Sequence, residues 1–231
     1  MQGAWASTWP IADRGVAPHM EPAVRAQFTD AVHAGVARLV GVDPAALVSI
    51  GGFESYVHET VVGGGPRIVR STWHERRSQD EIGGELHFVA ALADAGVPAC
   101  RALPLASGEL VGTVASDAGA FHICSFEKAP GAVLGREAWT DETFEVWGAL
   151  TGRMHHVAST YTPPAPPLTR PTWEQEYAEI ASIVANDPPY RTALRAVLGH
   201  IEELPRSPAT FGRIHTDLHR HNIFWHAGEP H

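Results

Sequence analysis

Glycine turns divide a β-prone segment in the first third of the chain, and this segment constrains the fold more than any other feature. Residues 47–50, 56–62 and 67–73 favour strands, and glycines at 51–52 and 63–65 separate them. Short β-prone runs joined by glycine turns are typical of antiparallel strands that follow one another along the chain. The sequence therefore predicts a meander of three strands.

Helical patterns flank this meander on both sides. Apolar side chains recur at helical spacing over residues 21–40, which predicts one amphipathic helix before the strands. A second helix is predicted over residues 78–95. It should end at Gly96, because Pro98 follows just beyond and this arrangement is usual at a helix C-terminus.

The predicted secondary structure changes from strands to helices near the middle of the chain. Strands are expected over residues 110–115 and 120–126, and Ala129-Pro130-Gly131 is typical of a linker. Beyond it the pattern predicts three helices, over residues 141–158, 172–185 and 190–204. This order predicts an α+β, bilobal architecture, with a β-sheet lobe over residues 1–128 and a mainly helical lobe over residues 129–231.

Composition excludes several classes of protein. The 231 residues are 44% apolar and 19% charged, as is ordinary for a globular protein. The net charge of −9 argues against nucleic-acid binding, which needs a basic surface. Two cysteines make no disulfide framework, and no apolar run is long enough to span a membrane. Because the first residues also lack a signal-peptide pattern, we expect a cytoplasmic protein with no nucleic-acid or membrane partner. Its oligomeric state is left open.

The segment from His215 to Asn222 has the form H-x-D-x-x-x-x-N. A carboxylate at the position of Asp217 can orient a hydroxyl nucleophile and accept its proton. The neutral amide oxygen of Asn222 can ligate Mg²⁺ without adding another charge. Their separation lets a loop reverse direction, so that both side chains face one cleft. Asn occurs only at positions 186 and 222, so a chance match to this pattern is rare.

This segment resembles the catalytic loop of aminoglycoside phosphotransferases, choline kinases and homoserine kinases, and the resemblance covers about residues 48–225. It implies a protein-kinase-like fold and transfer of the γ-phosphoryl group of ATP, with GTP as the alternative donor, to a hydroxyl of a small molecule. The resemblance makes Asp217 the catalytic base, His215 a residue that braces the loop, and Asn222 a ligand of Mg²⁺. Thr216 departs from the family, which most often has Gly there.

The resemblance also assigns nucleotide-binding residues in the first half of the chain. Gly51-Gly52-Phe53 matches the loop that covers the nucleotide, where glycine lets the backbone approach phosphates. Arg70 falls where the family has a lysine that binds the ATP phosphates, and arginine can hold phosphate oxygens in a forked contact. Glu85 matches the helix glutamate that pairs with this lysine. Glu81, one helical turn away, is the alternative.

The segment from Phe126 to Gly131 resembles the hinge of the family, where main-chain groups bind the edge of adenine. Glu127 and Lys128 lie within this segment. On this basis both are assigned to nucleotide binding through their main chains.

One residue of the family pattern is missing from the sequence. Kinases of this type carry a second magnesium-binding aspartate about a dozen residues after the loop asparagine. The sequence ends at His231, before that position is reached, and residues 228–231 are typical of the turn before the strand that would carry it. We therefore expect a truncated chain that binds nucleotide weakly, with activity in a longer protein.

Two other interpretations stay open. A non-catalytic pseudokinase or scaffold on the same fold is favoured by Arg70 in place of lysine and by the missing aspartate. A zinc site unrelated to kinases is suggested by His215, His219 and His221, because clusters of histidine bind zinc. The substrate is not named by the sequence, although the negative net charge slightly favours a cationic one.

Overall fold

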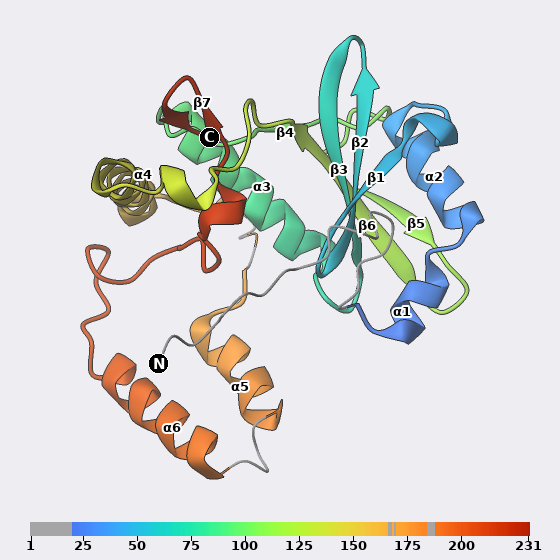
Figure 1. The fold of residues 1–231 in the computed structure, drawn as a ribbon. Coiled ribbons are helices and arrows are strands. Elements are labelled where there is room, and N and C mark those ends of the chain that lie inside the picture. Colours follow the sequence, from blue (N-terminus) through green and yellow to red (C-terminus); the bar gives the residue numbers. More distant parts are fainter. Residues whose placement is uncertain (1–19, 166–167, 169, 184–187) are drawn as a thin grey trace, which may run out of the picture. The chain divides into compact units, whose positions relative to one another are not determined.

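The computed structural model describes residues 20–165, 168, 170–183 and 188–231 (Figure 1). Contacts within the chain divide it into two units. The first unit comprises the residues up to Gln79 together with Ala102–Lys128, and the second comprises Asp80–Arg101 together with Ala129–His231. The first unit carries a large β-sheet, and the second is mainly helical.

The sheet of the first unit has six strands, and all its pairings are antiparallel. Its strands are β1 (Val48–Gly51), β2 (Ser55–Val62), β3 (Gly65–Trp73), β4 (Ala102–Leu103), β5 (Gly112–Ala115) and β6 (Ala120–Glu127). The strand order is β1-β2-β3-β6-β4, and β5 pairs with another part of the same edge of β6. The predicted meander is confirmed as β1, β2 and β3.

A two-residue turn joins β2 to β3 and sets their register. The strands pair without a break as far as Val62 opposite Gly65. Between these two residues Gly63 and Gly64 have φ angles of 60° and 83°. Two positive φ angles are what the tightest hairpin turn requires, and glycine adopts them at little cost.

The helix predicted over residues 21–40 is in fact two helices, α1 (Pro22–Gln27) and α2 (Asp30–Val40). The hydroxyl of Thr29 caps α2 by accepting a hydrogen bond from Val32 N at 3.4 Å. Between the helices the Phe28 ring stacks on the Tyr56 ring of β2, with the ring centres 3.9 Å apart. The single-helix prediction was wrong because helical spacing reveals neither the cap nor this contact with a distant strand.

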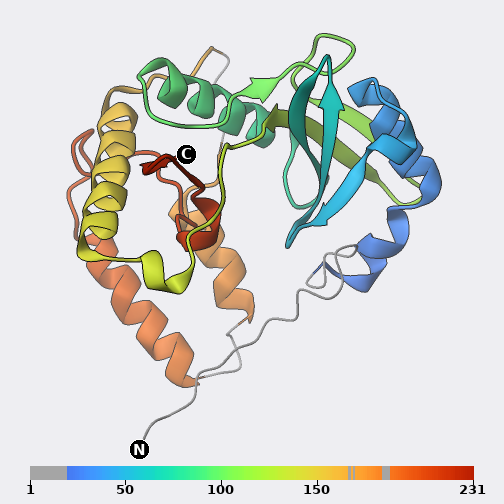
Figure 2. The ribbon, with the colours of Figure 1, turned by 45° about the horizontal axis from the view of Figure 1, so that its top comes forward.

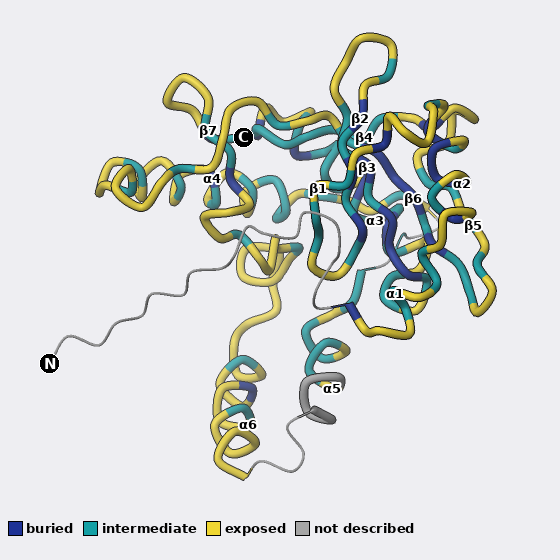
Figure 3. The backbone as a smooth tube through the Cα atoms, turned by 45° about the vertical axis from the view of Figure 1, so that its right-hand side comes forward, coloured by how far each residue is buried: buried dark blue, intermediate teal, exposed yellow. Residues whose placement is uncertain are grey.

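Alternation along the strands gives the sheet two different faces. Tyr56, Val69 and Phe121 are buried with Val36 of α2 in one apolar core. Figure 2 shows α2 beside the sheet, and Figure 3 draws parts of β3 and β6 in the colour of buried residues. Side chains at the intervening positions, Arg70 among them, belong to the opposite face. The two faces can therefore serve different purposes.

The second unit confirms the predicted helices to within a few residues. Its elements are α3 (Gln79–Asp94), the 3₁₀ turn η2 (Arg136–Ala138), α4 (Asp141–Thr160), α5 (Trp173–Ile183), α6 (Pro188–Glu202), the 3₁₀ turn η3 (Arg220–Asn222), β7 (Trp225–His226) and β8 (Glu229–Pro230). Leu92, Val97 and Leu150 form a core where α3 and α4 meet. By its contacts α3 groups with this unit, and a lobe boundary after residue 128 stays a prediction.

The predicted turn over residues 228–231 needs one correction. The turn is formed by Ala227 and Gly228, both with positive φ, and Glu229–Pro230 already pairs with β7 as strand β8. His231 and Phe224 then exchange two main-chain hydrogen bonds of 2.7 and 3.0 Å, which continue the hairpin. No helix among the described residues is long and apolar enough to cross a lipid bilayer.

The buried His58 predicts a pH-dependent stability. It lies on the packed face of β2 with 3% of its surface exposed. Burial, and secondarily the neighbouring His33, lowers the pKa of His58 from 6.5 to about 4. The folded state therefore binds fewer protons than the unfolded state between these values, so stability is complete above about pH 6.5 and falls as the pH decreases.

We predict that acidification from about pH 7 to about pH 5 lowers the free energy of unfolding by about 2 kcal/mol through His58. Urea unfolding followed by circular dichroism measures this change. His58→Phe keeps a ring beside Phe28 and should remove that part of the pH dependence. Burial also lowers the pKa of His122 and of His215, so the remainder should persist. An unchanged pH dependence in the variant would contradict this prediction.

Candidate active site

The His215–Asn222 segment forms a loop in the second unit that is held at both ends. Just before it, Arg213 donates a hydrogen bond to Leu168 O at 3.0 Å, and its guanidinium lies 5.1 Å from the centre of the Tyr161 ring. Just after it, Ile223 is 1% exposed. The contacts of Arg213 before the loop and the burial of Ile223 after it thus hold a loop whose polar side chains are exposed.

A reversal of the chain brings the two most important side chains of this loop into contact. Asn222 Nδ2 donates to the main-chain oxygen of Asp217 at 2.8 Å and to its carboxylate Oδ2 at 3.1 Å. The turn η3 makes this reversal, because it ends at Asn222. The carboxylate remains accessible, with 71% of the Asp217 side chain exposed.

His219 lies beside the Asp217 carboxylate, and sequence reasoning considered it only as a zinc ligand. Its Nδ1 caps η3 by accepting a hydrogen bond from His221 N at 3.1 Å. Its Nε2 lies 3.5 Å from Asp217 Oδ1 and 3.4 Å from Asn222 Nδ2. Because Nδ1 accepts, the proton of the neutral ring is on Nε2, facing the carboxylate. The missed signal was a polar side chain directly before a short turn.

No group of three or more His, Cys, Asp or Glu side chains is arranged to hold a metal ion in the part of the chain that the structure describes. The zinc site suggested by the histidines of the loop is therefore not formed there. These rings serve instead as caps and hydrogen-bond partners within the loop.

His215 accepts a hydrogen bond at Nδ1 from the main-chain N of Asp217 at 3.3 Å. Much of its surface is exposed, yet surrounding atoms exclude enough water to lower its pKa, and the nearby Asp217 and Glu85 carboxylates only partly oppose this desolvation. A lowered pKa keeps the imidazole neutral near pH 7, which leaves Nδ1 able to accept. The neutral ring can therefore hold the backbone in front of the carboxylate.

Thr216 has a φ of 63°, in the left-handed region. Its hydroxyl donates to His215 O at 2.6 Å. This conformation costs an L-residue about 1–2 kcal/mol, whereas glycine adopts it freely. The position where the resembling family most often has Gly is thus one where the backbone itself favours glycine.

The loop offers oxygen ligands to a divalent cation. Because Asn222 Nδ2 is engaged with Asp217, its amide Oδ1 is left as an acceptor beside an exposed carboxylate. An amide oxygen is one of the hard donors that Mg²⁺ prefers, so Asn222 Oδ1 fits this ion. It supplies only part of the roughly six oxygens that the ion needs, and phosphate oxygens and water usually complete the shell.

In the first unit, a β-bulge lies between Ser49 and Gly51, and Gly51 is the last residue of β1 and leads into Gly52 and Phe53. Gly52 has a φ of 134°, and a Cβ built there would lie 1.9 Å from Ser55 O. Only glycine fits this position, because any side chain would collide with the backbone of β2. Phe53 beyond it is 61% exposed. The segment therefore presents backbone and one aromatic ring at the surface.

Arg70 lies in the middle of β3, opposite Val57 of β2 and Cys124 of β6. Its guanidinium is 5.2 Å from the centre of the Phe126 ring, a cation–π distance. All four side chains belong to the face of the sheet opposite the α2 core. The guanidinium of Arg70 on this face is thus held by a cation–π contact with Phe126.

The remaining predicted residues are divided between the two units. In the first unit Lys128 pairs with Glu59 at 2.6 Å, and Glu127 ends β6 at an exposed position. In the second unit Glu85 of α3 lies 3.5 Å from Arg170, an interaction that sequence reasoning missed. Because Arg70 and Glu85 belong to different units, their predicted pairing stays a prediction.

Comparison with known proteins identifies the class that this fold and loop define. The sequence model of the phosphotransferase enzyme family matches residues 46–231. The chain belongs to the phosphotransferase enzyme family. An amicoumacin kinase from Bacillus subtilis (strain 168) is 31% identical over 180 residues, which are 76% of this chain and 53% of that protein. The chain thus spans about half the length of this relative.

Solved structures confirm the predicted protein-kinase-like α+β fold. An amicoumacin kinase in complex with AMP-PNP and Ca²⁺ matches with a TM-score of 0.79 and 26% identity, over 90% of this chain and 64% of that one. A microcompartment-associated aminopropanol kinase matches with a TM-score of 0.65 and 23% identity, over 84% of this chain and 63% of that one. The second likeness concerns the fold alone.

The left-handed backbone at Thr216 makes a testable prediction. Thr216→Gly removes a cost of about 1–2 kcal/mol in the folded state and loosens the unfolded chain by somewhat less, so it should stabilise the protein by up to about 1 kcal/mol. Thermal unfolding followed by circular dichroism measures the gain. Thr216→Ala is the matched control, because it keeps Cβ and loses the hydroxyl, and should give no gain. A glycine variant that melts below the alanine variant would refute this account.

Proposed function

We propose that this protein transfers the γ-phosphoryl group of ATP to a hydroxyl group of a small molecule. The observation that carries the proposal is the contact between Asn222 and Asp217, in a chain of the phosphotransferase enzyme family. This contact brings a carboxylate and an amide oxygen together at an exposed place. Phosphoryl transfer needs that combination, since one group serves the nucleophile and the other the metal.

Asp217 acts on the acceptor. Its carboxylate orients the acceptor hydroxyl and takes its proton as the oxygen bonds to the γ-phosphorus, while the bond to the β-phosphate oxygen breaks and ADP leaves. Asn222 and His219 hold this carboxylate in one orientation through the contacts at 3.1 and 3.5 Å. His215 braces the backbone at Asp217 N. Most of the rate gain then comes from positioning.

Asn222 Oδ1 would hold Mg²⁺, which when bound neutralises charge on the phosphates. Arg70 binds phosphate oxygens through its guanidinium fork, and Glu85 steadies that arginine. Main-chain N–H groups of Gly51-Gly52-Phe53 cover the phosphates, an approach that glycine permits. These roles follow the family resemblance and stand as proposals.

The main chain at Glu127 and Lys128 binds the edge of the nucleotide base. We take ATP rather than GTP as the donor, because the solved amicoumacin kinase holds the ATP analogue AMP-PNP. Amicoumacin is the first acceptor to test, since the relative of 31% identity is an amicoumacin kinase. Aminoglycosides, homoserine and choline follow, and the net charge of −9 favours a cationic acceptor.

A nucleotide-binding pseudokinase or scaffold is the second candidate. It is favoured by the arginine at position 70, whose guanidinium lies 5.2 Å from the Phe126 ring. The resembling family has a lysine at this position, and arginine and lysine are not interchangeable in their contacts with phosphate. Nucleotide binding without turnover on any acceptor would select this candidate.

The two loop residues make separable predictions. Asn222→Ala should weaken Mg²⁺-dependent ATP binding to this chain at least about tenfold in titration calorimetry, because an oxygen ligand is lost. Asp217→Asn should leave ATP affinity nearly unchanged. The Asp217→Asn variant should also lower turnover with amicoumacin and ATP by at least about a hundredfold, because the base is lost. This turnover is measured in a chain as long as the Bacillus subtilis amicoumacin kinase.

Asp117→Asn, the same change at an exposed position in the first unit, is the control and should alter neither quantity. Full turnover in Asp217→Asn would show that another group is the base. ATP binding that ignores both Mg²⁺ and Asn222→Ala would remove the metal role from this loop.

Arg70 provides an independent test in the first unit. Arg70→Ala should reduce ATP affinity at least about tenfold, because a charge-assisted contact to phosphate is lost. Arg67→Ala is the matched control. Arg67 lies three residues earlier on β3, so it points to the other face of the sheet, where it donates to Pro104 O at 2.8 Å. Equal losses in both variants would mean that the effect is only one of net charge.

A further inference from the structure

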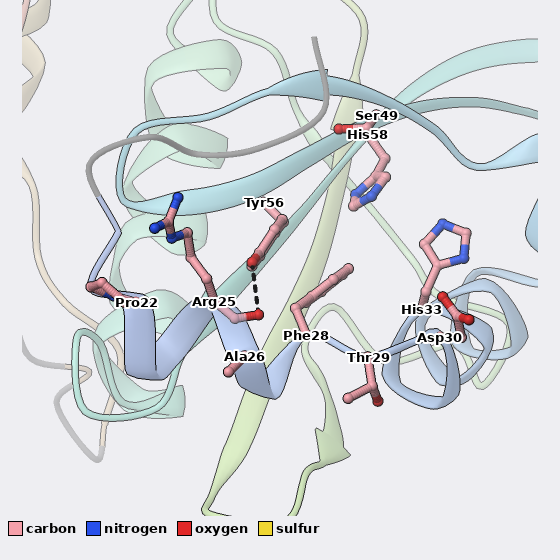
Figure 4. A pocket seen from close by; sticks show the side chains of 10 residues that line it. All are labelled: Pro22, Arg25, Ala26, Phe28, Thr29, Asp30, His33, Ser49, Tyr56 and His58. Carbon is pink, nitrogen blue, oxygen red and sulfur yellow. Dashed lines mark hydrogen bonds between the residues drawn. The ribbon is translucent and has the colours of Figure 1, made fainter. Parts of the chain in front are cut away.

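A cavity of about 610 Å³ lies in the first unit between α1, the start of α2 and strands β1 and β2 (Figure 4). We call it the α1–β2 cavity; the residues that line it are Pro22, Arg25, Ala26, Phe28, Thr29, Asp30, His33, Ser49, Tyr56 and His58. Small-molecule sites usually have volumes of about 300–1,000 Å³ and combine aromatic walls with a few polar groups. This cavity has both the size and the composition of such a site.

The cavity is separate from the proposed nucleotide site. Tyr56 and His58 point to the face of the sheet that packs with α2, where both are buried. Arg70 lies opposite Val57, the residue between them, and so belongs to the other face. The proposed function therefore makes no use of the α1–β2 cavity.

Two buried nitrogen atoms on its lining have no hydrogen-bond partner among the described residues. They are His58 Nδ1, on a side chain that is 3% exposed, and Arg25 Nε. Buried polar atoms are nearly always hydrogen-bonded, and an exception calls for a ligand or a bound water. Both residues line the cavity, which can hold such a partner.

Aromatic rings form the middle of the cavity. The Phe28 ring stacks on Tyr56 with centres 3.9 Å apart and on His58 with centres 5.7 Å apart. In Figure 4, Arg25 lies on one side of Phe28, while His33 and His58 lie on the other. An occupant that spans the cavity thus meets an apolar middle between two polar ends.

The end at Arg25 suits an anionic group. The guanidinium carries a fixed positive charge, and the Tyr56 hydroxyl beside it makes only a long hydrogen bond of 3.4 Å to Arg25 O. Burial raises the pKa of Tyr56, more than the charge of Arg25 lowers it, so the hydroxyl stays protonated and able to donate. Asp30 also lines the cavity, and Figure 4 shows it beside His33, on the side away from Arg25.

We propose that the α1–β2 cavity binds a small organic anion, whose carboxylate or phosphate contacts Arg25 and the Tyr56 hydroxyl and whose apolar part lies against Phe28. The far end of the ligand then meets His58 Nδ1. A bare anion satisfies only the Arg25 end, so a ring attached to the anion should raise the affinity.

The test uses this whole chain with labelled histidine rings, whose NMR signals report on His58 and His33. Phenyl phosphate, benzoate and inorganic phosphate are the three probes. We expect saturable shifts of these two signals with phenyl phosphate or benzoate, at lower concentration than with inorganic phosphate. Tight binding of phenyl phosphate alone identifies a phosphate ligand, and of benzoate alone a carboxylate ligand. The His58→Phe variant identifies the His58 signal.

Arg25→Gln should weaken binding of the better probe at least about tenfold. Arg38→Gln, the same change at an exposed position of α2 outside the cavity, should leave it unchanged. Circular dichroism verifies that both variants are folded. The proposal is overturned if no probe gives a saturable shift, or if Arg25→Gln binds as well as Arg38→Gln.

Discussion

The unbroken pairing of β2, β3 and β6 is the constraint on which the first unit depends. Once the turn at Gly63-Gly64 sets the register, every side chain of these strands is assigned to one of two faces. One face builds the core with α2 and the α1–β2 cavity. The other presents Arg70 beside Phe126. A shift of one residue would exchange the two faces, so structure and proposed nucleotide binding share a single register.

The second unit holds the exposed polar loop from His215 to Asn222 in one conformation. Hydrogen bonds among its own residues do this: Asn222 and His219 meet Asp217, and His215 holds the backbone at Asp217 N. Within this loop the backbone of Thr216 adopts a left-handed conformation, which costs conformational free energy. Positioning of this kind is what phosphoryl transfer asks of a protein, since the reaction needs little covalent chemistry from it.

Sequence reasoning reached the elements and the loop but missed particular contacts. The three strands of the meander and the helices of the second unit were predicted correctly, because strand and helix patterns are local signals. The break between α1 and α2 was missed because it depends on Phe28 reaching Tyr56 in a distant strand. The role of His219 was missed because a run of histidines suggests metal binding before it suggests a cap. The partner of Glu85 could not be foreseen, since Arg170 lies far along the chain.

By itself the sequence determined the strands of the meander, the helices of the second unit, the family, and the candidate base Asp217 with its partner Asn222. These features follow from local periodicity and from residue types at a short, specific spacing. Only the tertiary structure decided that the Asn222 amide donates to Asp217 and that the backbone of Thr216 adopts a left-handed conformation. It also decided that Arg25 and His58 line one cavity. The reason is physical: such contacts depend on backbone angles and on packing between segments distant in sequence, and no single stretch of residues encodes them.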